Sequence, residues 1–202
     1  MTKNFDKIRP LLNFDEKEEN FYFLQILQRK KDHKKGKVNG TNNNSRLIKA
    51  YYISSMEYFD FIEPEIIELC NIFQARAGIN LNKRNYEKMS LQLLRKLTDQ
   101  ILNKDFNKAY KAYSSVVGAY NHDTDKKWII DIDQGELEGR KLNDMILFIE
   151  RECQPIGAKY IATIPSKTGK HVITRPFNLQ TFKEQYPDIE VHKNNPTNLY
   201  IP

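Results

Sequence analysis

The chain has 202 residues, of which 40% are hydrophobic and 29% are charged, and its net charge at pH 7 is +6. This composition excludes an intrinsically disordered chain, and the length is sufficient for one or two compact units with a sizeable core. The first residues carry no apolar signal region, and no apolar run is long enough to span a membrane. The two cysteines, Cys70 and Cys153, have neither the spacing of a zinc site nor that of a disulfide framework. We therefore expect a soluble cytoplasmic protein with buried thiols, whose positive charge favours a polyanionic partner such as nucleic acid or nucleotide phosphate.

The N-terminal part, residues 1–126, is predicted to form an α/β unit. Its first feature is a hairpin of strands at 21–29 and 46–53, joined by a loop over 30–46 that is rich in lysine, glycine and asparagine. This loop has two interpretations, a basic finger that grasps phosphate or a solvated surface loop, and the sequence does not separate them.

Helical patterns follow this hairpin. Pro64 predicts the first turn of a helix, and a short strand is expected at 75–81 with Arg76, Gly78 and Asn80 on one face. Asn82 or Asn85 is expected to cap the next helix. Two stripes of apolar residues at helical spacing are interpreted as core: Tyr86, Met89, Leu93, Leu94, Leu97 and Ile101, then Phe106, Tyr110, Tyr113, Val116 and Val117.

The most informative stretch is an alternating strand that ends in two carboxylates, Trp128–Asp133. Residues two apart in a strand share a face, so Asp131 and Asp133 point together. Two like charges this close are unfavourable unless a positive charge lies between them, and a divalent metal ion with oxygen ligands meets that need. The alternative is a strand that ends in a solvated turn, where aspartate is common.

The order of elements after residue 127 predicts an α+β unit over 127–202 with an RRM-like, or ferredoxin-like, split βαβ sheet. Such a sheet has the strand order 4-1-3-2, helices on one face and an open face on the other. The elements on which this prediction depends are strands at 128–133, 159–164, 170–175, 188–192 and 198–201 and helices at 137–152 and 178–185.

In that topology polar residues of three strands converge on the open face. His171 and Arg175 share a face of the third strand, and Asp188, Glu190 and His192 share a face of the fourth. Two aspartates and a third acid suit Mg²⁺ or Mn²⁺, and charged His and Arg donate hydrogen bonds to phosphate.

A tight basic turn lies beside these strands, formed by Ser166, Lys167, Thr168 and Gly169. Its backbone N–H groups could face a phosphate. It is not a P-loop, because the glycine-lysine-serine/threonine order is absent.

Together these residues resemble the archaeo-eukaryotic primase superfamily, which includes the primase-polymerases. The first motif of that family, a hydrophobic strand ending in Asp-x-Asp, matches 129–133, and its second, a small residue followed by any residue and His, matches Gly169-Lys170-His171. The third, a hydrophobic residue and an acid on a late strand, matches Ile189-Glu190 best, with Asp188 as the alternative acid. Glycine stands in the second motif where serine is common. The resemblance covers 127–202.

The resemblance implies that Asp131, Asp133 and Glu190 bind metal and that His171 contacts the incoming nucleotide. The leading hypothesis is therefore a metal-dependent nucleotidyltransferase of DNA replication that joins nucleoside triphosphates on a single-stranded template, with a helicase or other replication proteins as partners. Lysine- and asparagine-rich composition also suits a phage or mobile-element gene. The further residues expected to contact nucleotide are Ser166, Lys167 and Arg175 and, from the N-terminal half, Arg76, Asn80 and Arg84.

Two alternatives stay open at this point. One is a non-catalytic RRM-like module that binds nucleic acid, although such modules stack bases on aromatic residues, and the corresponding positions here are acids, His and Arg. The other keeps the metal site but makes the protein a nuclease or another phosphotransferase.

Overall fold

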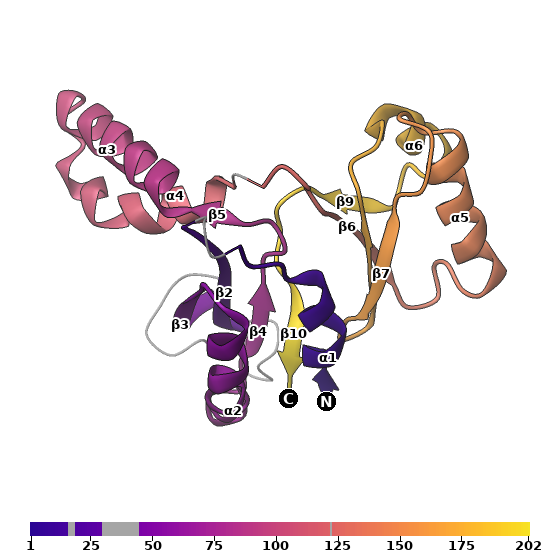
Figure 1. The fold of residues 1–202 in the computed structure, drawn as a ribbon, viewed down its shortest axis with the longest axis horizontal. Helices are drawn as coiled ribbons and strands as arrows, with labels where there is room; N and C mark the ends of the chain where they lie inside the picture. The colour runs from indigo at the N-terminus through magenta and orange to yellow at the C-terminus, as the bar shows by residue number, and fades with distance from the viewer. Residues whose placement is uncertain (16–18, 30–44, 122) are drawn as a thin grey trace.

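A computed structural model describes residues 1–15, 19–29, 45–121 and 123–202. The predicted loop at 30–46 thus lies almost wholly outside the described residues. The chain is an α+β protein with two antiparallel sheets, which lie side by side in Figure 1. No helix in the described part of the chain combines the length and the apolar character that a membrane crossing requires.

The first sheet has the strand order β1-β10-β4-β2-β3, and the short β5 pairs with the beginning of β2. On one of its faces a short helical segment near the N-terminus, α1 with η1, and the long helix α2 enclose the largest core, which includes Leu24 and Ile26 of β2 and Ile62 and Ile66 of α2. The elements are β1 (Thr2–Lys3), α1 (Phe5–Ile8), η1 (Arg9–Leu11), β2 (Asn20–Arg29), β3 (Ser45–Ile53), α2 (Met56–Phe73), β4 (Arg76–Ile79), β5 (Arg84–Asn85) and β10 (Thr197–Ile201).

Helix α2 begins earlier than the sequence suggested. Its N-cap is Ser55, whose side chain accepts a hydrogen bond from the backbone N–H of Tyr58 at 3.1 Å. Pro64 therefore lies inside the helix and not in its first turn, so that prediction is wrong. The hydroxyl cap and the apolar stripe that continues through the proline outweigh the single backbone hydrogen bond that proline removes.

A helical hairpin of α3, η3 and α4 covers only one end of the opposite face and projects from the body of the protein (Figure 1). It buries Phe21 and Phe23 of β2 against Met89, Val116 and Val117. The N-cap of α3 is Asn85, one of the two residues, with Asn82, that the sequence offered for this position. The three elements are α3 (Tyr86–Leu102), η3 (Phe106–Lys111) and α4 (Ala112–Ala119).

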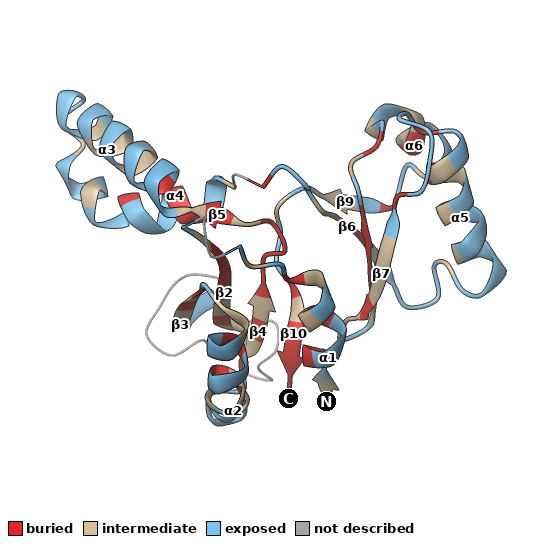
Figure 2. Ribbon diagram, in the orientation of Figure 1, coloured by how far each residue is buried: buried red, intermediate tan, exposed pale blue. Residues whose placement is uncertain are grey.

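The interpretation of both apolar stripes of this hairpin as core is only partly right. Met89 is the one buried residue of α3, and Figure 2 shows most of the hairpin as exposed or intermediate. The expected core residues that are instead exposed are Tyr86, Leu94, Ile101, Phe106, Tyr110 and Tyr113. A helix pattern reveals which residues share a face, but not whether a second layer covers that face.

The second sheet has the strand order β7-β8-β6-β9, and all of its pairings are antiparallel. Helix α5 connects β6 to β7, and α6 connects β8 to β9. Both helices pack on the same face, where Met145 and Ile149 of α5 and Phe182 of α6 meet Ile130 and Val172. The elements are β6 (Trp128–Asp133), α5 (Arg140–Arg151), β7 (Tyr160–Pro165), β8 (Gly169–Thr174), α6 (Leu179–Gln185) and β9 (Glu190–His192).

The return from α5 to β7 is fixed by one carboxylate. Glu150 accepts hydrogen bonds from the backbone N–H groups of Lys159 at 2.9 Å and Tyr160 at 3.1 Å. These two bonds lower the pKa of Glu150, because they stabilise its charged form. Both cysteines are buried free thiols, as predicted.

The other face of the second sheet is not open along its whole length. Ile129, Ile164 and Ile173 join the core of the first sheet, and only the polar end of this face remains accessible. The last strand, β10, also differs from expectation, because it pairs with β4 and β1 of the first sheet and not with the second. The chain therefore crosses between the sheets twice.

Two buried asparagines hold these crossings in place. Asn82 accepts a hydrogen bond from the N–H of Lys127 at 2.7 Å and donates to the carbonyls of Lys127 at 2.9 Å and Lys193 at 3.1 Å. Asn80 donates to the carbonyl of Asn194 at 2.6 Å. Because both side chains are nearly inaccessible to solvent, they fix the relative position of the two sheets.

Candidate active site

The register of the second sheet places three of the predicted site residues in one row. Asp131 on β6 pairs with His171 on β8 and with Glu190 on β9, so the aspartate lies between the histidine and the glutamate. Asp133 lies two residues farther along β6, opposite Gly169. Because the side chains of a strand alternate, all four polar residues face the side away from α5 and α6.

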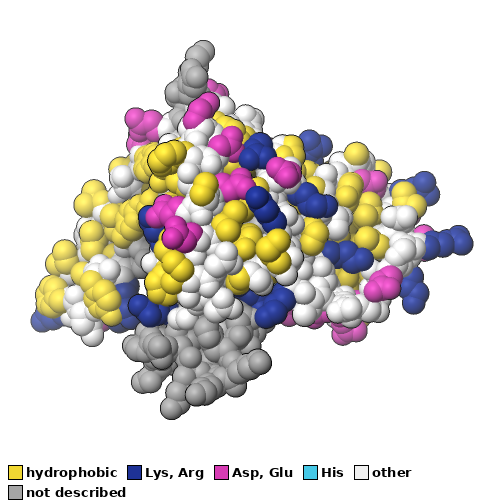
Figure 3. All heavy atoms as spheres, turned by 90° about the horizontal axis from the view of Figure 1, so that it is seen from below, with side chains coloured by type: hydrophobic (Ala, Val, Ile, Leu, Met, Phe, Trp, Pro, Cys, Tyr) yellow, Lys and Arg dark blue, Asp and Glu magenta, His cyan; other side chains and the backbone are white. Residues whose placement is uncertain are grey.

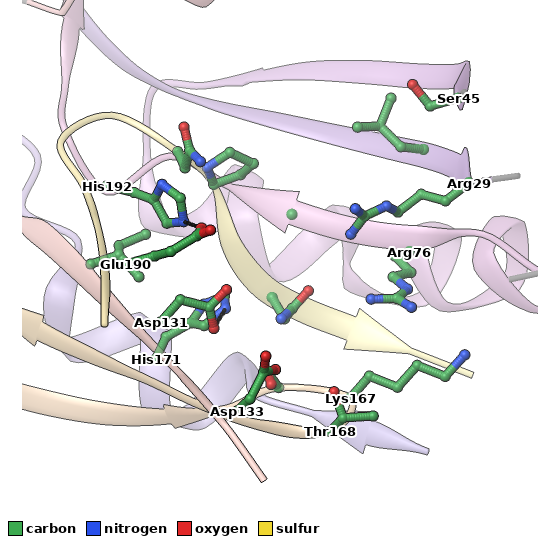
Figure 4. A pocket seen from close by; sticks show the side chains of 17 residues that line it. Arg29, Ser45, Arg76, Asp131, Asp133, Lys167, Thr168, His171, Glu190 and His192 are labelled. Carbon is green, nitrogen blue, oxygen red and sulfur yellow. Dashed lines mark ion pairs between the residues drawn. The ribbon is translucent and has the colours of Figure 1, made fainter. Parts of the chain in front are cut away.

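This row forms one wall of a cavity of about 560 Å³ between the two sheets. The opposite wall comes from the first sheet, where Arg29 of β2 and Arg76 of β4 point toward the carboxylates (Figure 4), and Lys167 lines the cavity from the turn between β7 and β8. The carboxylates of the cavity thus belong to the second sheet, and its two arginines belong to the first. Such a division of charge suits a ligand that carries both phosphate groups and a cation.

His171 is held by residues of both sheets. Its Nδ1 lies 2.9 Å from the hydroxyl of Thr197 on β10, and its Nε2 lies 3.5 Å from Oδ1 of Asp131. The pKa of His171 is lowered chiefly by burial, a shift that Asp131 opposes and His192 reinforces. The neutral imidazole is therefore favoured near pH 7 in this structure, and it can donate one hydrogen bond and accept another.

The third predicted acid, Glu190, points toward its neighbour on the same strand. Its Oε2 lies 3.2 Å from Nε2 of His192, and its side chain is largely exposed. Asp131 and Asp133 supply oxygen atoms of the type that Mg²⁺ and Mn²⁺ bind. Among the residues that the structure describes, however, no three His, Cys, Asp or Glu side chains are gathered as a set of metal ligands. The donor chemistry fits a divalent cation, but the orientation of Glu190 does not complete a site.

Gly169 allows the strands that carry this site to approach closely. A Cβ atom at this position would lie 2.0 Å from the carbonyl oxygen of Ile132 and 3.0 Å from the Cα of Asp133. The turn that precedes Gly169 is closed by a hydrogen bond from the N–H of Ser166 to the carbonyl of Gly169 at 3.0 Å. Glycine at this position therefore sets the distance between Asp133 and the basic turn.

Three of the predicted contact residues lie elsewhere. Arg84 has no exposed surface, and its guanidinium donates to the carbonyls of Val117 at 2.7 Å and Asn82 at 3.2 Å. Arg175 follows the far end of β8 and lies 3.7 Å from Asp125. Neither residue lines the cavity, and Asn80 supports the loop at its rim through Asn194 instead of lining it.

The remaining predicted residues, Ser166, Lys167 and Arg76, do line the cavity. Sequence reasoning missed several others, of which Arg29 contributes the most charge. Arg29 ends a predicted strand and carried no motif, so only the packing of the two sheets reveals it. His192 was expected on the same strand face as Glu190 but without a role in the site, and it lines the cavity 3.2 Å from that glutamate. Thr168, which belongs to the predicted basic turn, also lines the cavity, and the other lining residues that were not predicted are Leu27, Ser45, Gly78, Ile129, Asn195, Pro196 and Asn198.

No family model matches the sequence, and the comparisons with curated proteins and with solved structures give no significant match.

Proposed function

We propose that the protein is a metal-dependent nucleotidyltransferase of primase-polymerase type, which joins nucleotides on a single-stranded nucleic-acid template. The observation that carries this proposal is the cross-strand row of His171, Asp131 and Glu190, with Asp133 beside it, opposite the basic side chains of Arg29 and Arg76. Nucleotidyl transfer needs both halves of this arrangement, because the triphosphate is strongly negative and its reacting phosphorus must be approached by a hydroxyl.

The strand order of the second sheet supports the same proposal. Numbered in chain order, β6, β7, β8 and β9 lie in the order 4-1-3-2, with α5 and α6 on one face. We infer an RRM-like catalytic unit in which the motif-bearing strands are neighbours, as the resemblance to the primase-polymerases implies. An RRM-like module that only binds nucleic acid fits less well, because no Phe, Tyr or Trp side chain lines the cavity among the described residues.

In the proposed reaction the 3′-hydroxyl of a growing strand forms a bond to the α-phosphorus of a nucleoside triphosphate. The bond from that phosphorus to the β-phosphate oxygen breaks, the hydroxyl proton departs, and pyrophosphate leaves. Asp131 and Asp133, with Glu190 as the third acid, would hold a divalent cation, which when bound would neutralise phosphate charge and lower the pKa of the attacking hydroxyl.

The other side chains of the cavity bind and orient the nucleotide. Arg29, Arg76 and Lys167 offer positive charge to the β- and γ-phosphates, and the two guanidinium groups suit paired phosphate oxygens. His171, neutral and fixed by Thr197, donates or accepts a single hydrogen bond at the bound nucleotide. These contacts place the triphosphate across the gap between the sheets, with its α-phosphorus toward the aspartates.

The decisive experiment is incorporation of labelled nucleotides on a single-stranded template, with and without a primer, in Mg²⁺ and separately in Mn²⁺. The wild-type protein is expected to incorporate nucleotide with at least one of the two ions. Asp131→Asn is expected to lower the rate at least about 100-fold, because it removes a charge that acts at the reacting centre. A matched control is Asp144→Asn, an exposed aspartate on α5, which should not change the rate.

The outcomes separate the alternatives. Absence of incorporation by the wild-type protein under both ions would contradict the polymerase proposal. Degradation of the template, lost in Asp131→Asn, would identify a nuclease that uses the same site. Mn²⁺ binding measured by calorimetry gives a second readout, since Asp131→Asn should weaken it and Asp144→Asn should not.

A further inference from the structure

The face of the first sheet that carries the helical hairpin continues into the cavity. Phe23 of β2 packs against the hairpin, and Leu27 and Arg29 of the same strand line the cavity. Even numbers of positions separate these residues, so their side chains lie on one face of β2. The extra residue at the register shift between β2 and β3 is Ile48 of β3, which leaves the alternation of β2 intact. One face of the sheet therefore connects the hairpin with the cavity.

The middle of this face is only partly covered. Gln25 of β2 pairs with Ala50 of β3 and with Gly78 of β4, so the three residues form a row across the face. All three are half-buried, whereas Leu24 and Ile26, on the other face of β2, are inaccessible to solvent. A ligand can therefore lie over this row.

Exposed tyrosines of the hairpin mark the far end of this face. Tyr52 of β3 pairs with Phe23, and its ring centroid lies 6.0 Å from that of Tyr113 on α4. Tyr113 is 44% exposed, and Tyr110, three residues earlier, is 77% exposed. Because residues three apart in a helical segment are neighbours on its surface, Tyr110 extends the row of rings along the hairpin.

The charge around these rings is positive. Residues 103–120 carry three lysines and one acid, Asp105, which forms an ion pair with Lys108 at 2.8 Å. Two lysines thus remain in excess, and one of them, Lys111, places its Nζ 5.1 Å from the ring centroid of Tyr110. Helix α3 adds three basic residues and two acids, which does not reverse the sign. In Figure 3, hydrophobic side chains, a class that includes tyrosine, lie beside Lys and Arg side chains at the end of the molecule that carries α3 and α4.

Aromatic rings beside lysines suit single-stranded nucleic acid. Its unpaired bases stack on the rings and its phosphates contact the lysines, so such binding tolerates many sequences. The other end of the face favours the same polyanion, since Arg29 and Arg76 lie there. A second copy of this chain fits less well, because it would bring the same excess of positive charge to the interface.

We propose that this face binds single-stranded nucleic acid, whose bases stack on Tyr52, Tyr110 and Tyr113 while the strand continues over the middle of the face to the cavity. The inference rests on the proposed function in one respect, because it identifies the bound strand as the template. From Phe23 to Arg29, β2 rises about 20 Å at roughly 3.4 Å per residue. A stacked strand rises about 3.4 Å per nucleotide, so about six nucleotides reach from the tyrosines to the cavity.

The test measures the binding of fluorescein-labelled oligothymidylates of about 4, 8, 12 and 18 nucleotides to the full chain by fluorescence anisotropy, without nucleoside triphosphate or metal. The affinity of the wild-type protein is expected to rise at least about 10-fold as the length passes about six nucleotides. Tyr110→Ala/Tyr113→Ala should remove this rise and weaken binding of the longest strand at least about 10-fold, because two stacking contacts are lost. Tyr110→Phe/Tyr113→Phe retains the rings and should bind as the wild type does.

Further variants control for exposure, charge and folding. Tyr160→Ala is the matched control, because Tyr160 of β7 is 43% exposed, and it should leave binding unchanged. Lys111→Gln should reduce the slope of log affinity against log salt concentration by about 0.7. Duplex DNA should bind the wild type and the alanine double variant equally, since its bases already stack on one another. Thermal melts check folding, and Tyr110→Ala alone, at the most exposed of the three tyrosines, repeats the test if the double variant does not fold.

Several results would overturn the inference. These are absence of binding by the wild-type protein, an alanine double variant that binds as tightly as the wild type, and a phenylalanine double variant that loses as much affinity as the alanine one. A concentration-dependent dimer, seen by analytical ultracentrifugation and abolished in the alanine double variant, would assign the face to a second copy.

Failure of the proposed function gives a different pattern. Tyrosine-dependent binding without any nucleotide incorporation would leave the binding site standing and overturn the polymerase proposal. Incorporation that depends on template length equally in the wild type and in the alanine double variant would support the polymerase proposal and overturn the template path.

Discussion

Replacing Gly169 by alanine is expected to destabilise the protein by separating β8 from β6. The new Cβ would lie 2.0 Å from the carbonyl oxygen of Ile132, and both nearest neighbours, this oxygen and the Cα of Asp133, are backbone atoms. No side-chain rotation can relieve the contact. Because non-bonded carbon contacts are optimal at about 3.5–4.0 Å, the strands must move apart by roughly 1 Å or more.

The size of this effect follows from the cost of overpacking. Inserting one methyl group into a filled site costs about 1–3 kcal/mol. The upper end applies here because the obstructing atoms belong to a paired strand, so we expect a loss of about 3 kcal/mol in the free energy of unfolding. For a chain of this length that loss corresponds to a decrease in melting temperature of about 6–12 °C.

The assay is thermal and urea denaturation followed by circular dichroism. Gly118→Ala is the matched control, because Gly118 lies in α4 and a Cβ there would meet nothing within 4 Å. It should gain about 0.5–1 kcal/mol from the higher helix propensity of alanine. Gly169→Ser, the residue common in the resembling family, should lose stability as Gly169→Ala does. A Gly169→Ala protein that melts within a degree of the wild type would refute the reasoning.

Three further predictions concern the crossings, the return to β7 and the third acid. Asn82→Ala removes three hydrogen bonds to backbone groups and should cost about 3–5 kcal/mol in urea denaturation; a loss below 1 kcal/mol would contradict its assigned role. Glu150→Gln should cost at most about 1 kcal/mol at pH 7, since solvent screens this partly exposed carboxylate. Because the folded pKa of Glu150 is lowered, its advantage is present above the unfolded pKa near 4.5 and should disappear as the pH falls through the folded pKa; a difference that persists at pH 2 would exclude the charge as its cause. Glu190→Gln should abolish nucleotide incorporation while Asp188→Asn retains it, and the reverse result would transfer the role of third acid to Asp188.

Much of the second sheet was predictable because its signals are local. The strand at 128–133 has the predicted bounds, and the bounds of the following helices and strands differ by a few residues. Backbone geometry decides to which face of a sheet each residue of a strand points. Placing Asp131 and His171 on one face therefore required only the correct choice of neighbouring strands. The α+β class followed from the order of the same elements.

What could not be predicted depends on contacts between distant parts of the chain. The partner of β10 is decided by which sheet edge is free, and Arg29 reaches the cavity only because two sheets pack against each other. Because of its positive charge, Arg84 was expected to contact the nucleotide. It is instead fully buried, and the ring centroid of Phe23 lies 5.3 Å from its Cζ atom. Sequence shows that an arginine is present, but not whether water or an aromatic ring surrounds it.

The position of β10 has a consequence for how the protein is made. Because β10 fills the gap between β1 and β4, residues 2–3 and 76–79 cannot gain their shared neighbour until residues 197–201 have left the ribosome. The edge of β4 is therefore unpaired until that segment has emerged, and an unpaired edge can add a strand from another chain. The hydroxyl of Thr197, which fixes the histidine of the cavity, emerges with the same segment. A nascent chain would thus gain a competent site only after residues 197–201 have emerged, and slow translation between β4 and β10 would prolong the interval in which it is open to aggregation.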